Sequence, residues 1–201
     1  MGYYNKIFAR FYDPFMASME KELYEKRKAL IENLEGEVLE IGSGTGVNFE
    51  FYSEKANVLA IEPSENMMEK AKAKLAPNQN IRLENWGMHY EDLANEIQHQ
   101  SLDAIVCTLV MCTVPEPEKA FEIYKKWLKP DGKLIVMEHI HSKNQFKGTM
   151  QTVFNPLWKK VGDGCNLNRK TDQIIKNAGF VEEHSDYFKL GLDFYYGVFH
   201  I

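Results

Sequence analysis

The sequence predicts an α/β fold built around a mostly parallel sheet with helices on both faces. Short apolar runs of strand length alternate with segments in which apolar residues recur at helical spacing, a pattern typical of βαβ units. A loop with three glycines follows the first apolar run, where a nucleotide-binding α/β domain turns from strand to helix. The chain closes with two β-like runs, which predict a terminal hairpin whose last strand is antiparallel.

Five apolar runs predict strands that are each followed by a helix or a loop. The strands are expected at Glu37–Ile41, Asn57–Glu62, Ile81–Asn85, Leu102–Thr108 and Lys133–His139. The intervening helices are expected at Asn48–Glu54, Glu65–Leu75, Glu91–Gln98 and Glu116–Leu128. Pro130-Asp131-Gly132 is expected to end the last of these helices and to turn the chain into the fifth strand.

The C-terminal third is expected to begin with a loop and to end in a hairpin. His141–Gly148 is polar and predicts a loop inside the domain. Thr171–Asn177 has helical character, and Gly179 is expected to stop that helix. Phe180–Glu183 and Phe194–His200 are the two β-like runs that we expect to pair and to join the sheet.

The N-terminal segment carries an unusually aromatic helical face. We expect residues 1–30 to form an N-terminal helical lid over a ligand. The alternatives are that this face packs on the core, as apolar helical faces commonly do, or that it makes a peripheral contact with a membrane interface. The residues that share the face are Tyr4, Ile7, Phe8, Phe11, Tyr12 and Phe15.

Length and charge limit the classes of protein that fit. The chain has 201 residues, which fits one domain over residues 1–201. Its formal net charge is −5, and no basic excess marks it as a protein that binds phosphate backbones. We therefore expect no nucleic acid partner, and no obligate protein partner is evident.

Cysteine usage and hydropathy predict a cytoplasmic protein. Cys107, Cys112 and Cys165 form no paired framework, and the N-terminus has no signal-peptide pattern. No apolar run approaches the roughly 18 residues that a membrane-spanning helix needs. The protein is expected to be soluble, or at most peripheral at a membrane surface.

The loop Gly42-Ser43-Gly44-Thr45-Gly46 and the acid Glu62 together predict a nucleotide-type site. A chain leaving a parallel strand must turn sharply, and missing side chains let ligand atoms approach the backbone N–H groups. Glu62 ends the next predicted strand, 20 residues beyond Gly42, where a carboxylate can accept both hydroxyls of a ribose. A structural turn and a solvated acid are the alternatives for these features taken singly.

The glycine spacing separates two classes of cofactor. A dinucleotide fingerprint requires G-x-G-x-x-G, whereas the third glycine here is Gly46 and Val47 follows it. The sequence also shows no second mononucleotide-binding half. We therefore expect an adenosyl-cofactor enzyme. A nucleotide-cofactor oxidoreductase is the first alternative, and a non-catalytic adenosyl-binding module is the second.

Four segments resemble, in order, the motifs of class I S-adenosylmethionine-dependent methyltransferases. They are Glu40–Gly46, Ile61–Ser64, Leu102–Val106 and Leu128–Leu134, and they span most of the chain. The resemblance implies a Rossmann-like sheet of seven strands with the last one antiparallel. It also implies that S-adenosyl-L-methionine donates the methyl group and leaves as S-adenosyl-L-homocysteine.

Further strings resemble the methyltransferase-like thiol methyltransferases and, more loosely, the phospholipid and ubiquinone-biosynthesis methyltransferases. They are Gly46–Tyr52, Val106–Cys112, Met137–His139 and Asp163–Leu167. This resemblance implies a small-molecule or lipid acceptor, which would be a thiol, a phospholipid amine or a quinol-like molecule.

The resemblance also implies which residues bind the cofactor. The glycine loop would lie against the methionine part, Glu62 on the ribose, and Pro63 and Met67 near the adenine. His89 stands where many relatives carry an Asp that accepts from the adenine amino group. The expected cofactor-binding residues are Glu40, Gly42, Ser43, Gly44, Thr45, Gly46, Asn48, Glu62, Pro63, Met67, Met88, His89, Cys107, Thr108 and Tyr12.

Few catalytic residues are required, because the methyl group of a sulfonium is already activated for displacement. A thiol or amine acceptor must lose a proton, and a nearby base would help. His139 at the end of the fifth strand and Asp163 in a Gly-bounded turn are the expected catalytic residues, and His141 is a further candidate base. The alternatives are a structural histidine and a turn-forming aspartate.

Cys165 could line the acceptor pocket, but we expect it to be a packed, inert side chain, as free cysteines commonly are. The spacing of Cys107 and Cys112 from nearby histidines matches no zinc motif. No metal is therefore expected.

Overall fold

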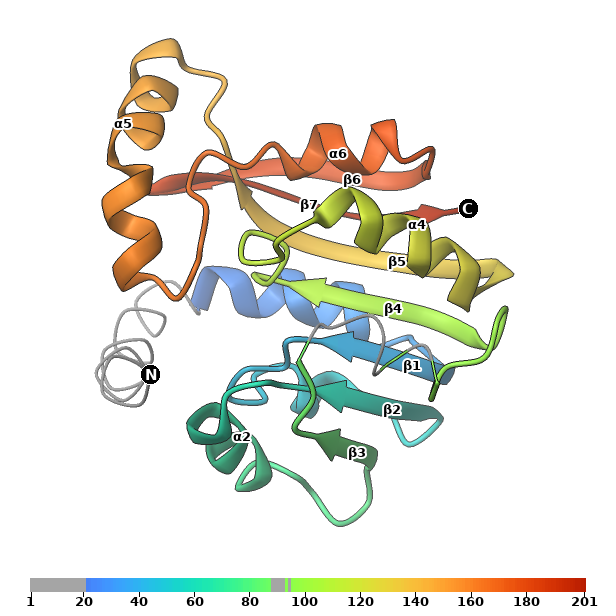
Figure 1. Cartoon of the computed structure of the whole chain (residues 1–201). Helices are drawn as coiled ribbons and strands as arrows, with labels where there is room; N and C mark the ends of the chain where they lie inside the picture. Colours follow the sequence, from blue (N-terminus) through green and yellow to red (C-terminus); the bar gives the residue numbers. More distant parts are fainter. Residues whose placement is uncertain (1–20, 88–92, 94) are drawn as a thin grey trace.

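The structure is a computed structural model of the 201-residue chain, and it describes residues 21–87, 93 and 95–201. The strands are β1 (Gly36–Ile41), β2 (Ala56–Ile61), β3 (Asn80–Glu84), β4 (Leu102–Thr108), β5 (Leu128–Ile140), β6 (Val181–Leu190) and β7 (Leu192–His200). They form one sheet in the order β3-β2-β1-β4-β5-β7-β6 (Figure 1). β7 is antiparallel to β5 and β6, while β1 to β5 pair in parallel. The predicted seven-stranded sheet with an antiparallel last strand is confirmed.

Helices cover both faces of this sheet, as predicted. They are α2 (Glu65–Lys72), α4 (Pro117–Trp127), α5 (Gln145–Val161), α6 (Thr171–Asn177), a helix over residues 21–31 and the short 3-10 turn η1 (Phe49–Phe51). In Figure 1, α4 and α6 lie in front of the strands and the helix of residues 21–31 lies behind them. Each face therefore has its own apolar layer, as expected for strands that are buried on both sides.

Alternate residues of the central strands supply these two layers. On the side of α4 and α6, the buried cluster includes Leu39, Ile105, Val136, Phe121, Tyr124 and Ile175. On the side of the helix over residues 21–31, it includes Val38, Val106, Met137, Leu23 and Ile31. The period of two along β1, β4 and β5 places successive side chains in opposite layers. This alternation determines on which face of the sheet each side chain lies where the strands end at the carboxyl edge.

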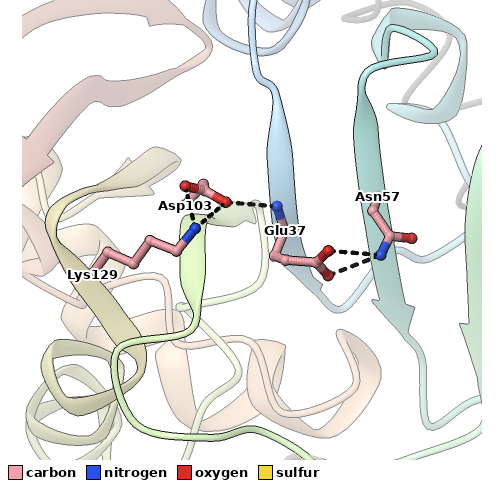
Figure 2. A network of polar contacts seen from close by, with 4 residues as sticks. All are labelled: Glu37, Asn57, Asp103 and Lys129. Carbon is pink, nitrogen blue, oxygen red and sulfur yellow. Dashed lines mark hydrogen bonds and ion pairs between the residues drawn. The ribbon is translucent and has the colours of Figure 1, made fainter.

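A polar network fixes the strand register at the amino edge (Figure 2). Asp103 at the start of β4 accepts from the Glu37 backbone N–H at 2.8 Å and from Lys129 Nζ at 2.7 Å. The Glu37 carboxylate accepts from Asn57 Nδ2 at 2.9 Å. These contacts join β1 to β2, β4 and β5. All of these contacts lie at the amino edge, whereas the loops described below lie at the opposite, carboxyl edge of the sheet.

The predicted boundary between α4 and β5 is wrong. The helix was expected to end in a turn at Pro130-Asp131-Gly132, but β5 begins directly at Leu128 and contains this tripeptide. A register shift lies opposite, between Leu102 and Ala104 of β4. Pro130 can occupy such a position because an irregular ladder does not need its missing N–H group.

The predicted loop His141–Gly148 is wrong over its second half, because α5 begins at Gln145. The Asn144 side chain caps this helix by accepting from the Lys147 N–H at 3.1 Å. The helix continues through Pro156 to Val161. Sequence patterning did not predict it, because most of its large apolar residues face away from the core.

Three smaller predictions also differ from the structure. The expected helix Asn48–Glu54 is only the 3-10 turn η1. The strand expected at Phe180–Glu183 runs to Leu190, as an edge strand whose side chains are mostly exposed. Of the expected helix Glu91–Gln98, Leu93 is helical, residues 95–98 are not, and residues 91, 92 and 94 lie outside the described part of the chain.

The predicted N-terminal lid also lies largely outside the described residues. Only residues 21–30 of this segment are described, and they are helical. The aromatic face from Tyr4 to Phe15 is not among them. None of the described helices has the length and apolarity that crossing a bilayer requires.

Candidate functional site

The glycine loop and Glu62 meet at the carboxyl edge of β1 and β2. The Gly44 N–H donates to Glu62 Oε2 at 2.9 Å, and the Ser64 N–H donates to Oε1 at 2.8 Å. Ser43 N–H donates to the Ile61 carbonyl at 3.0 Å. Burial raises the pKa of Glu62, although its two backbone donors oppose this shift. The two features that the sequence paired are therefore in direct contact, and the carboxylate has a fixed orientation.

Glycine is needed at positions 42 and 44 of the loop for different structural reasons. Both adopt left-handed backbone, with φ of 64° at Gly42 and 57° at Gly44. A Cβ at Gly42 would lie 2.4 Å from Val110 Cγ2, whereas a Cβ at Gly44 would meet no atom within 4 Å. Gly42 is therefore required by close packing against the loop after β4. Gly44 borders open space that a ligand can fill, which fits an adenosyl group held by the loop.

A buried polar network lies beneath the glycine loop, on the inner side of the protein. Asn48 Nδ2 donates to Glu40 Oε1 and to Thr108 Oγ1, both at 2.9 Å, and Arg27 Nη1 donates to Asn48 Oδ1 at 3.0 Å. Glu40 Oε2 is buried and has no hydrogen bond within 3.5 Å to a described residue. Burial raises the pKa of Glu40 to about 7, against the opposing effects of Asn48, Tyr52 and Arg27. The network ties β1, β4 and the helix over residues 21–31 to one position.

Glu138 connects the loop after β4 to the end of β5. Its Oε1 accepts from the Val110 and Met111 N–H groups, both at 2.7 Å. Glu138 is fully buried, and burial raises the pKa of its carboxyl to about 7. Since Val110 also faces Gly42, this carboxyl links the glycine loop to the His139 region. Glu138 could not be selected from the sequence, because a single acid inside an apolar strand gives no spacing signal.

A cluster of Cys112, His139 and Cys165 lies at this edge. His139 Nε2 lies 3.1 Å from Cys165 Sγ, and both Cys112 and His139 are buried. One ligand atom from each of the three residues lies within 4.8 Å of the others. The expectation of no metal rested on chain spacing. Spacing could not reveal this cluster, because the residues come from the loop after β4, the end of β5 and the loop after α5.

The electrostatics of the cluster favour a thiolate. Cys112 and His139 hold the pKa of the Cys165 thiol down, at about 4, although burial opposes this. Burial lowers the pKa of His139, but its contact with Cys165 outweighs this effect and raises the pKa overall. The pKa of Cys112 is raised by its contact with Cys165 and by burial. The expectation that Cys165 is simply packed and inert does not fit these contacts.

The loop after α5 is fastened to the loop after β4. The Asn166 N–H and Nδ2 both donate to the Cys112 carbonyl, at 3.0 and 2.9 Å. Arg169 Nη1 donates to the carbonyls of Met111 and Val114. Asp163 adopts left-handed backbone, with φ of 49°, which agrees with a turn-forming role. These contacts bring Cys165 to Cys112 and His139.

The remaining predicted residues are distributed unevenly. Ser43 and Thr45 are buried within the glycine loop, Met67 is buried at the start of α2, and Pro63 follows Glu62. Cys107 is fully buried in the apolar layer of α4 and α6. The residues Tyr12, Met88 and His89 lie outside the described part of the chain.

His141 is separate from the cluster. Its Nε2 lies 3.0 Å from the Gly148 carbonyl oxygen and 3.3 Å from Thr152 Oγ1. It lines an open cavity of about 500 Å³ at the start of α5, together with Lys143, Asp172 and others. This cavity includes no residue of the glycine loop.

Known proteins resemble this chain in sequence and in fold. A family model described as "Methyltransferase domain" matches residues 39–136. Thiol S-methyltransferase TMT1B of Rattus norvegicus is 35% identical over 170 residues, which cover 83% of this chain and 69% of that protein. Thiol S-methyltransferase TMT1A of Homo sapiens is 29% identical, over 87% of this chain and 75% of that protein.

A solved structure supports the same assignment at the level of the fold. The S-adenosylmethionine-dependent methyltransferase from Mesorhizobium loti superposes with a TM-score of 0.65 at 14% identity, over 89% of this chain and 97% of that chain. The oxidoreductase alternative is not favoured by any of these similarities. The glycine loop held by Glu62, the sheet order, the matching family model and the relatives agree, and the chain belongs to the class I S-adenosylmethionine-dependent methyltransferases.

Proposed function

We propose that this enzyme methylates small thiols, with the acceptor bound beside His139 and Asp163. The observation that carries the proposal is the cluster of Cys112, His139 and Cys165 at the edge where the glycine loop meets Val110. A site with two polarisable sulfur atoms and an imidazole suits a sulfur acceptor better than a phospholipid amine or a quinol. The relatives named thiol S-methyltransferase support the same acceptor class.

We propose that the cofactor lies across the glycine loop, with its ribose on Glu62. When bound, S-adenosylmethionine supplies a methyl group already activated by the sulfonium charge. The chain contributes position: Gly44 leaves room, and the Gly44 and Ser64 N–H groups hold the Glu62 carboxylate in a fixed orientation. The adenine contacts of Met88 and His89, and the contact of Tyr12, are part of this proposal.

The acceptor class can be tested directly. The full chain is incubated with methyl-labelled S-adenosylmethionine and, in parallel, with alkyl thiols, phosphatidylethanolamine vesicles and a hydroquinone. We expect labelled thioethers from the thiols and at least a tenfold lower rate with the other acceptors. Methylation of the lipid amine or the hydroquinone without methylation of any thiol would refute the proposed acceptor.

Substitution of the two glycines is expected to separate folding from cofactor binding. Gly44→Ala should weaken S-adenosylmethionine binding about tenfold or more, because the methyl group enters the open space, while strain costs only about 1 kcal/mol. Gly42→Ala should lower the free energy of unfolding by about 2 to 4 kcal/mol, because strain and overpacking against Val110 add. Calorimetry and denaturant unfolding measure the two effects. Unchanged binding of S-adenosylmethionine by Gly44→Ala would show that the cofactor does not occupy the space beside Gly44.

We also propose that the N-terminal segment of residues 1–30 is a lid whose aromatic part covers α5, within a single domain of residues 1–201. The α5 helix exposes a continuous apolar face made of Phe146, Met150, Val153, Phe154, Leu157, Trp158 and Val161. The sequence between Tyr4 and Phe15 is rich in aromatic residues, whose apolar side chains suit such a cover. Since α5 leads directly into the Cys165 loop, a cover on α5 would enclose the acceptor and exclude water.

Removal of residues 2–16 is expected to raise the acceptor KM at least fivefold and to change the melting temperature little. Phe154→Asp on α5, which is half-exposed, should reproduce this effect. Exposed Val181→Asp on β6 serves as the matched control and should leave the KM unchanged. If the melting temperature alone falls, the segment is only packing. If the full chain binds anionic vesicles and the shortened chain does not, at equal KM for soluble thiols, the segment is a membrane contact.

We infer a cytoplasmic location, with a peripheral contact at a membrane surface as the alternative, from the state of the cysteines. Cys107, Cys112 and Cys165 are free thiols. Reduced cysteines beside the acceptor site suit a reducing compartment. Fractionation of expressing cells, with the chain followed by immunoblot, tests this location.

A further inference from the structure

The cluster of Cys112, His139 and Cys165 has the composition of a soft metal site. One ligand atom from each residue lies within 4.8 Å of the others. Cys112 and His139 are buried, whereas Cys165 is partly exposed and gives a ligand a route to the cluster. His139 Nδ1 is buried without a hydrogen bond to a described residue. Hydrogen bonding among the described residues therefore does not account for both ring nitrogens.

The geometry is close to that of zinc bound by two cysteines and one histidine. With Zn–S bonds of about 2.3 Å and a Zn–N bond of about 2.0 Å, tetrahedral ligand atoms stand roughly 3.5 to 3.8 Å apart. The three ligand atoms lie within 4.8 Å of one another, so shifts of about 1 Å or less in the side chains would bring them to these separations. The contact of 3.1 Å between His139 Nε2 and Cys165 Sγ is shorter than a bound pair would be. An outward shift of the imidazole by roughly half an ångström would correct it.

The residues around the cluster of Cys112, His139 and Cys165 suit a divalent cation, because their charges can balance it and the loops that carry the thiols are rigidly held. Two thiolates neutralise Zn²⁺, so the loaded site carries no net charge into a buried position. The buried carboxyl of Glu138 lies on the same strand end, and the Arg169 guanidinium lies near both thiols, where it can balance one further negative ligand. Asn166 and Arg169 fix the loop that carries Cys112 through its backbone carbonyls. The thiol ligands are therefore held in place without the metal.

We propose that Cys112, His139 and Cys165 bind one Zn²⁺ ion and leave its fourth position open for the acceptor thiol. The part that concerns the acceptor rests on the proposed thiol methyltransferase function. Sites with three protein ligands and one open position are the catalytic type of zinc site. Two sulfur ligands with one nitrogen ligand favour zinc over magnesium or calcium, which prefer oxygen.

The reaction at such a site balances simply. The acceptor thiol binds Zn²⁺ and releases its proton to solvent, so the sulfur is a thiolate at neutral pH. This sulfur attacks the methyl carbon, a new S–C bond forms, and the bond from carbon to the sulfonium sulfur breaks with its electron pair remaining on that sulfur. The products are a neutral thioether and S-adenosylhomocysteine. A neutral thioether is a weaker zinc ligand than a thiolate, which favours its release.

Metal binding is tested on the full chain purified without chelators. We expect about one zinc per chain by elemental analysis, and thiolate-to-cobalt charge-transfer absorption after replacement by Co²⁺. Cys112→Ser and Cys165→Ser should each lower zinc affinity at least tenfold, whereas Cys107→Ser, in the apolar layer, should retain it. Circular dichroism confirms that each variant is folded. Equal zinc affinity in all four proteins, or a cobalt form without thiolate absorption, overturns the site.

The acceptor position is tested on the cobalt form. Addition of an alkyl thiol should shift and strengthen the charge-transfer absorption, and addition of the matching alcohol should not. An unchanged spectrum would show that the acceptor thiol does not bind the metal. The metal would then have only a structural role, and the proposed open position for the acceptor would be overturned. If chelator-treated, zinc-free enzyme methylates thiols at the full rate, this inference fails while the proposed function stands. If no thiol is methylated with or without zinc, the proposed function fails, and the metal content still decides the site.

Discussion

Replacement of Glu62 by alanine is expected to weaken S-adenosylmethionine binding about 100-fold or more. The buried Glu62 carboxylate accepts from the N–H groups of Gly44 and Ser64, at 2.9 and 2.8 Å. Each hydrogen bond to a charged group contributes about 1.5 to 3 kcal/mol, so loss of the acceptor releases the glycine loop and removes the proposed ribose contact together. Isothermal titration calorimetry measures the change in affinity.

Two further variants show whether this effect is specific. Glu62→Gln keeps one acceptor oxygen and should lose about tenfold in affinity. Glu84→Ala removes a partly exposed carboxylate at the end of β3, beside β2, and should bind the cofactor like the parent protein. If Glu62→Ala also binds like the parent, the carboxylate neither contacts the ribose nor holds the glycine loop in its binding conformation.

The stability of the protein is expected to fall between pH 5 and pH 8 because of Glu40. Burial raises the pKa of Glu40 to about 7, compared with about 4.3 for an unfolded chain. The folded state therefore holds the proton more tightly than the unfolded state does. This stabilisation is complete below about pH 4 and is lost as the pH rises through 7, at a cost of about 3 kcal/mol. Arg27 opposes the shift and Glu62 increases it.

Glu40→Gln isolates this contribution, because glutamine cannot ionise. Denaturant unfolding of the parent and the variant at pH 5 and pH 8 should show that their difference in free energy changes by about 3 kcal/mol in favour of the variant at pH 8. Glu37→Gln, on the exposed start of the same strand, should follow the parent at both values. Parallel pH profiles for the parent and Glu40→Gln would contradict the raised pKa.

The donor side of the enzyme could be predicted from the sequence, because local rules govern it. A strand, a glycine turn and an acid at a fixed spacing follow one another in the chain, so Gly42, Gly44 and Glu62 were recognisable before their contact was known. The parallel strands were also recognisable, since both faces are buried and their apolar runs are short and continuous. Among the parallel strands, the start of β5 was not predicted correctly, because Pro130 and Gly132 indicate a turn unless the opposing strand is irregular.

The acceptor side could not be predicted in the same way. Cys112, His139 and Cys165 lie far apart in the chain, and no local pattern joins them. The contacts that unite them are hydrogen bonds from the Asn166 and Arg169 side chains to backbone carbonyls, which leave no signature in composition. Helix α5 was missed for a related reason. Its apolar residues do not face the core, so their pattern carried no information about the fold.

The fastening of the Cys165 loop to the loop after β4 has a consequence for how this enzyme could change over evolutionary time. Under the proposed function, the groups that bind the methyl donor lie in the first half of the chain, whereas α5 and the loop that follows it add groups around the acceptor. Because the join consists largely of backbone carbonyls, the side chains around it are free to vary while Asn166 and Arg169 are retained. New acceptors can therefore be sampled by exchange of residues 141–165, with the methyl-donor half left intact.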